Sequence, residues 1–204
     1  MKRFASVFGV LLCAFISFVA ALYLFFPMDT ALELLWRKGM LAAAEKGVTL
    51  ETAFVGVDEY FPLRIVFRNV RVAAPVASAE AGMLTVRPLF VESILSMSPT
   101  AEIRLENFSL GIPLPGQPPI AFSTFYSKSS VRASAIQLSG IQTTGDLVIV
   151  GDLTVNPATA KLDEADLHIS GERASLLEFA KTMLPLQKDA SGAWTLKRKG
   201  GENK

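Results

Sequence analysis

The residues from Phe4 to Phe26 form a run of 23 positions without a charged side chain. Only two serines and one glycine interrupt its apolar character. As an α-helix the run would extend about 34 Å at 1.5 Å per residue, whereas the hydrocarbon core of a bilayer is ~30 Å thick. The sequence therefore predicts a single transmembrane helix near the N-terminus.

The flanks of this run predict its orientation. Basic residues mark the cytoplasmic side of a membrane helix, and aromatic residues favour its interfaces. A cleaved signal peptide and a buried core helix are the alternatives, but a signal peptide has an apolar core of about 7–15 residues and a small-residue cleavage site. The run is longer and shows no convincing site. We expect a cytoplasmic tip and anchor over residues 1–27, carried by Lys2, Arg3, Phe4, Phe26 and Pro27.

The composition of the chain has two parts. The whole chain is 50% hydrophobic, with a mean hydropathy of +0.38. Without residues 4–26, all 39 charged residues fall on 181 positions, close to the usual share of roughly 25% in soluble domains. The net charge of +1 gives no basic field for nucleic acid. One cysteine, Cys13, and one histidine exclude an intramolecular disulfide and the common metal sites, so we expect no cofactor and no metal.

An amphipathic stalk helix is predicted over residues 28–47. Thr30 and Glu33 have the spacing of a capping box, and Glu33 lies four residues before Arg37, as in a helical ion pair. Gly47 suits a left-handed cap at the C-terminal end. Helical spacing unites the apolar positions Leu32, Leu35, Trp36, Gly39 and Met40, and we expect this stripe to pack on the domain rather than on lipid.

Residues 48–199 are expected to form one mostly antiparallel β-sheet domain with two short helices, followed by a polar tail at 200–204. The period-two pattern predicts strands at 48–54, 63–72, 83–86, 101–112, 120–126, 131–138, 145–155, 161–170 and 194–197. The helices are expected at 89–95, opened by Pro88, and from a capping box at Ser175 to Pro185. The fold class is mainly β, of the β-rich α+β kind.

Two short internal repeats indicate similar β-units. The stretches around Asn69 and Asn107 share an apolar–charged–Asn–apolar pattern, which places asparagine at a bulge or turn where its backbone tolerates unusual angles. The tripeptide Gly-Asp-Leu occurs at Gly145 and again at Gly151. Chance similarity between short strands is the alternative explanation.

No arrangement of residues predicts an enzyme. Asp166, His168 and Ser170 alternate along one predicted strand, so they lie in a line and cannot converge as a catalytic triad does. Asp163 and Glu164 add to an acidic cluster that solvated turn residues explain better than a cation site does.

Apolar residues of the domain leave two interpretations open. They form either the core or a surface that accepts a partner strand or a lipid chain. The residues concerned are Leu89, Phe90, Ile94, Leu95, Phe122, Phe125 and Phe179.

The order of these features resembles the N protein of bacterial type II secretion systems and, more distantly, the AsmA-like envelope proteins. The resemblance rests on the anchor ending at Pro27, on 63–72, on the strand-then-helix step at 79–89, and on the end of the domain at 176–196. It implies a bitopic inner-membrane protein with a cytoplasmic N-terminus and a periplasmic β-domain. Its expected role is non-enzymatic assistance to other secretion-system proteins. The AsmA-like alternative implies a lipid held in a β-groove.

Overall fold

The computed structural model describes residues 13–15, 17–18, 27–75, 77–111, 118–157, 159, 161–181, 185–190 and 192–198. Most of the predicted anchor, including Lys2, Arg3, Phe4 and Phe26, lies outside these residues. Within the described part, no helix has both the length and the apolar character needed to cross a bilayer. The transmembrane helix therefore stays a prediction.

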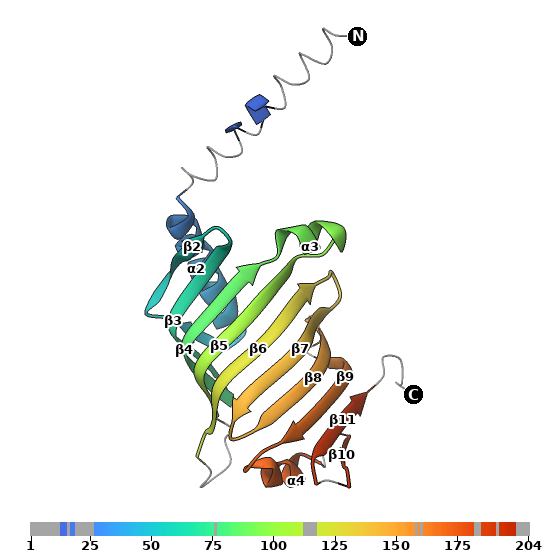
Figure 1. Cartoon of the computed structure of the whole chain (residues 1–204). Helices are drawn as coiled ribbons and strands as arrows, with labels where there is room; N and C mark the ends of the chain where they lie inside the picture. Colours follow the sequence, from blue (N-terminus) through green and yellow to red (C-terminus); the bar gives the residue numbers. More distant parts are fainter. Residues whose placement is uncertain are drawn as a thin grey trace, which may run out of the picture.

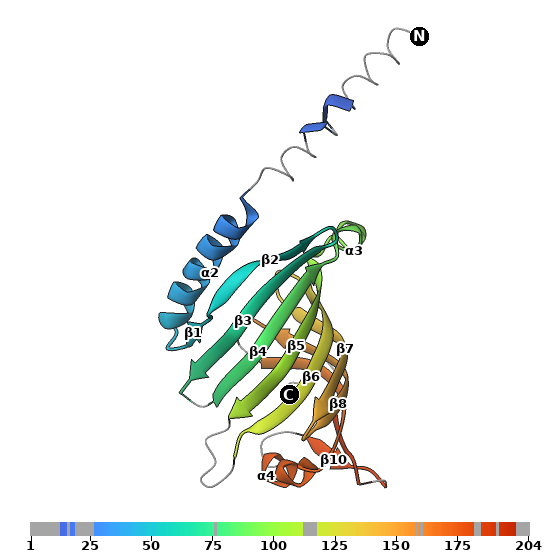
Figure 2. The same cartoon turned by 60° about the vertical axis from the view of Figure 1, so that its left-hand side comes forward.

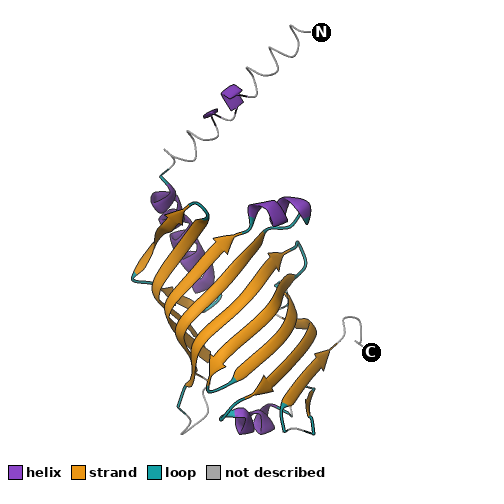
Figure 3. Ribbon diagram, viewed as in Figure 1, coloured by secondary structure: helices purple, strands orange, loops and turns teal. Residues whose placement is uncertain are grey.

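The described chain folds into one antiparallel sheet of eleven strands with helices at its margins (Figures 1 and 3). The strands are β1 (Thr49–Glu51), β2 (Phe54–Tyr60), β3 (Leu63–Ala74), β4 (Ala77–Pro88), β5 (Thr100–Gly111), β6 (Ile120–Val131), β7 (Ile136–Gly145), β8 (Val148–Asn156), β9 (Lys161–Ser170), β10 (Leu186–Lys188) and β11 (Trp194–Arg198). The helices are α2 (Met28–Ala44), α3 (Phe90–Leu95), the 3₁₀ turn η1 (Ala174–Leu176) and α4 (Leu177–Ala180). The predicted mainly β, antiparallel architecture is confirmed.

Strand order follows chain order over most of the sheet. The order is β1-β3-β4-β5-β6-β7-β8-β9-β11-β10, and β2 also pairs with β3. The first half of β3 pairs with β2 and its second half with β1, so the two short strands share one neighbour. The sheet curves strongly into the shape of a trough, and Figure 2 shows this curvature from the side.

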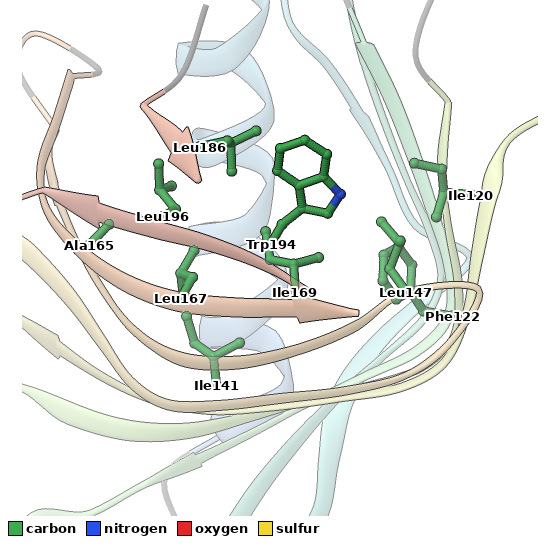
Figure 4. Close-up of a cluster of buried hydrophobic side chains, with 10 residues drawn as sticks. All are labelled: Ile120, Phe122, Ile141, Leu147, Ala165, Leu167, Ile169, Leu186, Trp194 and Leu196. Carbon is green, nitrogen blue, oxygen red and sulfur yellow. The ribbon is translucent and has the colours of Figure 1, made fainter. Parts of the chain in front are cut away.

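The main core lies on the concave face of this curved sheet. Figure 4 shows its ten buried side chains directed inward from strands β6, β7, β9, β10 and β11 and, for Leu147, from the turn between β7 and β8. Trp194 is the largest fully buried side chain of the described residues, with 1% of its surface exposed. Partly buried residues of η1 and α4, namely Ala174, Leu176 and Leu177, pack against this cluster.

Helix α2 covers the other end of the same face. The Trp36 ring lies 5.1 Å from the ring of Phe67 on β3, and the Glu33–Arg37 ion pair is present at 2.7 Å. Leu32, Trp36 and Met40 are half-buried, whereas Leu35 is exposed. The predicted stripe thus packs on the domain without Leu35. The left-handed backbone expected at Gly47 is confirmed by its φ of 74°.

Both predicted capping boxes are wrong. Helix α2 begins at Met28, two residues before Thr30, and no side chain caps it. Ser175 lies within η1, and neither η1 nor α4 has a side-chain cap. In both places the start of the helix is set by how the segment packs on the sheet rather than by the local cap. The last described helix is also shorter than expected, ending at Ala180.

Several strands also differ from prediction. Pro88 ends β4 instead of opening a helix, and β4 begins six residues before Met83, within a run of small residues. Pairing with β3 on one side and β5 on the other supplies the order that this small-residue sequence lacks. Strand β10 was not predicted, because three residues carry too little pattern.

The two internal repeats have structural meaning. Asn69 and Asn107 both have φ of 51°, and they lie on either side of Gly82 where the β3–β4 and β4–β5 registers skip a pair. The expected irregular backbone at both asparagines is confirmed. They flank Gly82 at the same level of three neighbouring strands, where the backbone pairing is interrupted without a change of register.

The two Gly-Asp-Leu repeats make the same kind of contact. The Asp146 carboxylate accepts a hydrogen bond from the Ala121 backbone N–H at 2.9 Å, and the Asp152 carboxylate accepts one from Gly140 at 2.8 Å. At Gly151, where φ is 141°, a Cβ atom would overlap the carbonyl oxygen of Asp166. Each aspartate therefore binds a backbone donor on the preceding strand.

Candidate functional site

The concave face of the sheet is mostly apolar, with the buried hydroxyls of Ser127 and Thr143 among its apolar side chains. Residues that lie directly opposite each other in register share a face, so the pairings trace rows across the strands. One row runs through Phe67, Leu84, Leu105 and Phe125 on strands β3 to β6. The stacked rings of Phe108 and Phe122, 4.4 Å apart, join this part of the face to the core in Figure 4.

This face is closed at its two ends and more open between them. Helix α2 covers the β2–β3 end, and β10, η1 and α4 cover the other. In between, Leu84 and Leu105 are only half-buried, and Phe67 is half-buried beside Trp36 of α2. Half-buried apolar rows on a concave surface are typical of sites for apolar ligands. We call the row Phe67–Leu84–Leu105, with its neighbours Ile65, Val86 and Ile103, the concave strip.

The convex face is polar and its charges are paired. Arg71 contacts Glu80 at 2.8 Å and Arg87 contacts Glu102 at 3.3 Å across neighbouring strands. Desolvation and, after it, the Glu102 carboxylate raise the pKa of Tyr126 on this face. An open depression of about 320 Å³ lies here, and its charged lining residues are Asp58, Arg64, Arg68, Arg87, Glu102, Arg104 and Glu106. Charges of alternating sign suit a solvated surface better than a site for one ion.

Arg173 links connections between strands at the end of the sheet near α4. Its guanidinium donates to the carbonyl oxygens of Pro118 and Pro119, at 3.0 and 2.8 Å, and to Asp146 at 3.4 Å. The hydrogen bond from Ala121, and then Arg173, lower the pKa of Asp146. These contacts join three connections and are structural.

The predicted interaction residues separate into two groups. Phe90, Ile94 and Leu95 are exposed on α3, with half-buried Leu89 before the helix. Phe122 is 5% exposed and Phe125 packs against the core, so these two belong to the concave face. The Phe179 side chain lies outside the description, and Pro27 precedes α2.

The residues considered for chemistry do not converge. Asp166, His168 and Ser170 are exposed and follow one another along the convex side of β9. Across the described residues, no three acidic, histidine or cysteine side chains gather as a metal site would require.

Sequence reasoning missed the concave strip. Its members were visible as alternating apolar positions, but which ones stand in one row depends on register. The pairing of β3, β4 and β5 keeps one register past Asn69 and Asn107, so it is the pairing of whole strands that brings these positions into one row.

A comparison with protein families gives one match. The model described as type II secretion system protein GspN-like, Synergistales, matches residues 5–198. No curated protein and no solved structure matches the chain.

Proposed function

Because the chain belongs to the GspN-like family of type II secretion system proteins, we propose that it is a non-enzymatic accessory component of that system. Residues 4–26 hold it in the bacterial inner membrane with the N-terminus in the cytoplasm. Residues 48–199 form the periplasmic domain, and other secretion-system proteins are its partners.

The extent of the family match carries this proposal. Residues 5–198 include both the apolar run and the complete described sheet, so the two parts match the family together. The apolar run has the length for one membrane crossing. The paired charges on the convex face and the absence of convergent acidic, histidine or cysteine side chains among the described residues are compatible with a role in assembly rather than catalysis.

Orientation is tested with reporter fusions. Alkaline phosphatase folds only where disulfides form, so a fusion after Lys204 is expected to be active in intact cells. A fusion before Lys2 is the matched control and is expected to be inactive. An inactive C-terminal fusion that is produced at normal level would contradict the proposed topology.

Partnership is tested by site-specific photo-crosslinking in cells that contain the secretion system. A photoreactive residue is placed on the convex face, either at half-buried Thr124 or at exposed Thr144. At each position it is expected to capture a secretion-system protein. The same residue at buried Ile141 is the control. Unchanged secretion in a deletion strain, together with no secretion-system adduct from either threonine, would contradict the proposal.

The concave strip supports a second candidate function, the binding of a lipid acyl chain. Leu84 and Thr85 are adjacent in β4 and point to opposite faces, so they form a matched pair for photo-crosslinking. Lipid handling predicts lipid adducts from position 84 and not from position 85. Equal labelling at both positions, or none at 84, would exclude this function.

A further inference from the structure

Three connections of the sheet lie at the same end of its strands. Ile65 pairs with Val86, Pro88 with Ala101, and Val131 with Ile136. The β2–β3 turn, the β4–β5 connection with α3, and the β6–β7 turn are therefore neighbours. We call the surface formed by these three connections the α3 edge, and Figure 1 shows it at the top of the sheet.

The five most exposed large apolar side chains of the described residues all lie at the α3 edge. Met97 is 95% exposed, Phe61 89% and Leu95 80%. Ile94 and Val91 follow at 75% and 71%, and Phe90 is 56% exposed. Single exposed apolar residues are ordinary, but six on two neighbouring connections indicate a surface that is covered in the working protein.

Helix α3 has its polar side turned toward the protein. Ser93 Oγ donates to the Leu89 carbonyl oxygen at 2.8 Å and accepts from the Thr100 N–H at 2.9 Å. Glu92 pairs with Lys128 on the convex face. The helix thus reverses the usual arrangement, in which the apolar side faces the core. Its outward apolar side needs an apolar environment beyond the domain.

The chain enters the domain at this same edge. The Asp29 carboxylate, in the first turn of α2, accepts a hydrogen bond from the Val57 N–H at 2.8 Å. Val57 is the central residue of β2, and Figure 1 shows the start of α2 beside this strand, on the same upper side of the sheet as α3. The uncharged run 4–26 ends two residues before α2 begins, so the membrane it is proposed to cross lies on the side of the α3 edge.

From these observations we infer that the α3 edge docks on the lipid bilayer. Phe61 on one connection and the outward side of α3 on another enter the interfacial layer, beside the point where residues 4–26 leave it. The domain then has two attachments to the membrane, one covalent and one peripheral, which fix its tilt. This inference rests on the proposed membrane anchoring by residues 4–26.

The test measures the surroundings of single positions in the full-length chain. Cys13→Ala removes the native cysteine, and Leu95→Cys, Phe61→Cys or Val150→Cys then introduces one site for an environment-sensitive NBD label. Val150 is 46% exposed on the convex face and is the matched control. The labelled chains are reconstituted into vesicles of phosphatidylethanolamine and phosphatidylglycerol that contain a shallow doxyl-labelled lipid.

Docking predicts a blue shift of NBD emission at positions 95 and 61 and quenching by the doxyl lipid, with neither change at 150. Flotation of each chain with the vesicles tests the anchor separately. Chains that float but keep labels 95 and 61 in water would overturn the docked edge while leaving the anchor intact. Blue shifts without doxyl quenching would assign the edge to contact with a second copy of the chain instead. Chains that do not float would overturn both proposals.

Discussion

The replacement Trp194→Ala tests whether the concave core closes the C-terminal end of the sheet. Trp194 is 1% exposed, and it is surrounded by Leu186 and Ile169 on the two neighbouring strands and by Leu196 on its own strand (Figure 4). Truncating a buried aromatic side chain to alanine costs about 3–5 kcal/mol, from lost transfer free energy and the cavity left behind. For a domain of this size that lowers the melting temperature by about 6–20 °C.

Trp36→Ala is the matched control. Trp36 is half-buried, and its ring contacts one aromatic partner, Phe67. Partial burial and one aromatic pair predict a loss of about 1–2 kcal/mol. Both variants remove the same side chain, so the difference between them reports the environment rather than the residue type.

The assay is urea unfolding of the full chain in micelles, followed by far-ultraviolet circular dichroism. The two variants are expected to keep the slope of the unfolding transition and to differ in midpoint. If Trp194→Ala loses no more stability than Trp36→Ala, the concave cluster is not the core, and the account of the sheet given above is wrong.

Three further outcomes follow from the backbone and the charges. Gly151→Ala places a Cβ on the Asp166 carbonyl and is expected to lower the free energy of unfolding by about 2–3 kcal/mol, measured by urea unfolding. Asn107→Gly is expected to be nearly neutral because φ is 51°, whereas Asn107→Val loses about 1–2 kcal/mol by the same measurement; equal effects would contradict the left-handed backbone. The pKa of Asp146 is lower in the folded protein than the ordinary aspartate pKa of about 3.9, so its carboxylate stabilises the fold at pH values above about 3.9. This contribution is lost as the pH falls through the pKa of the folded state. Asp146→Asn should therefore flatten the acid limb of stability against pH, and an unchanged limb would contradict the contacts with Ala121 and Arg173.

Local chemistry made part of the fold predictable. Alternation in 161–170 gave β9 with its exact bounds, since apolar residues at every second position fit one buried face. The irregular backbone at Asn69 and Asn107 followed from asparagine's tolerance of positive φ. The stalk helix was predictable because its apolar spacing and the Glu33–Arg37 pair both have the helical period.

Contacts between distant segments decided the rest. The small residues that open β4 become a strand because two neighbours pair with them, and Thr30 loses its capping role because the helix starts earlier. Phe122 and Ile94 have similar sequence signals, yet one is buried and the other is 75% exposed.

The sequence by itself determined an apolar N-terminal run, a helix after it and a β-rich domain, because composition and periodicity are local properties. Only the tertiary structure decided that Phe67, Leu84 and Leu105 form one row, since this depends on strand register. It also decided that α3 turns its apolar side outward at the α3 edge. Ser93 accepts a hydrogen bond from the Thr100 N–H at the start of β5, and this contact holds the polar side of the helix against the sheet.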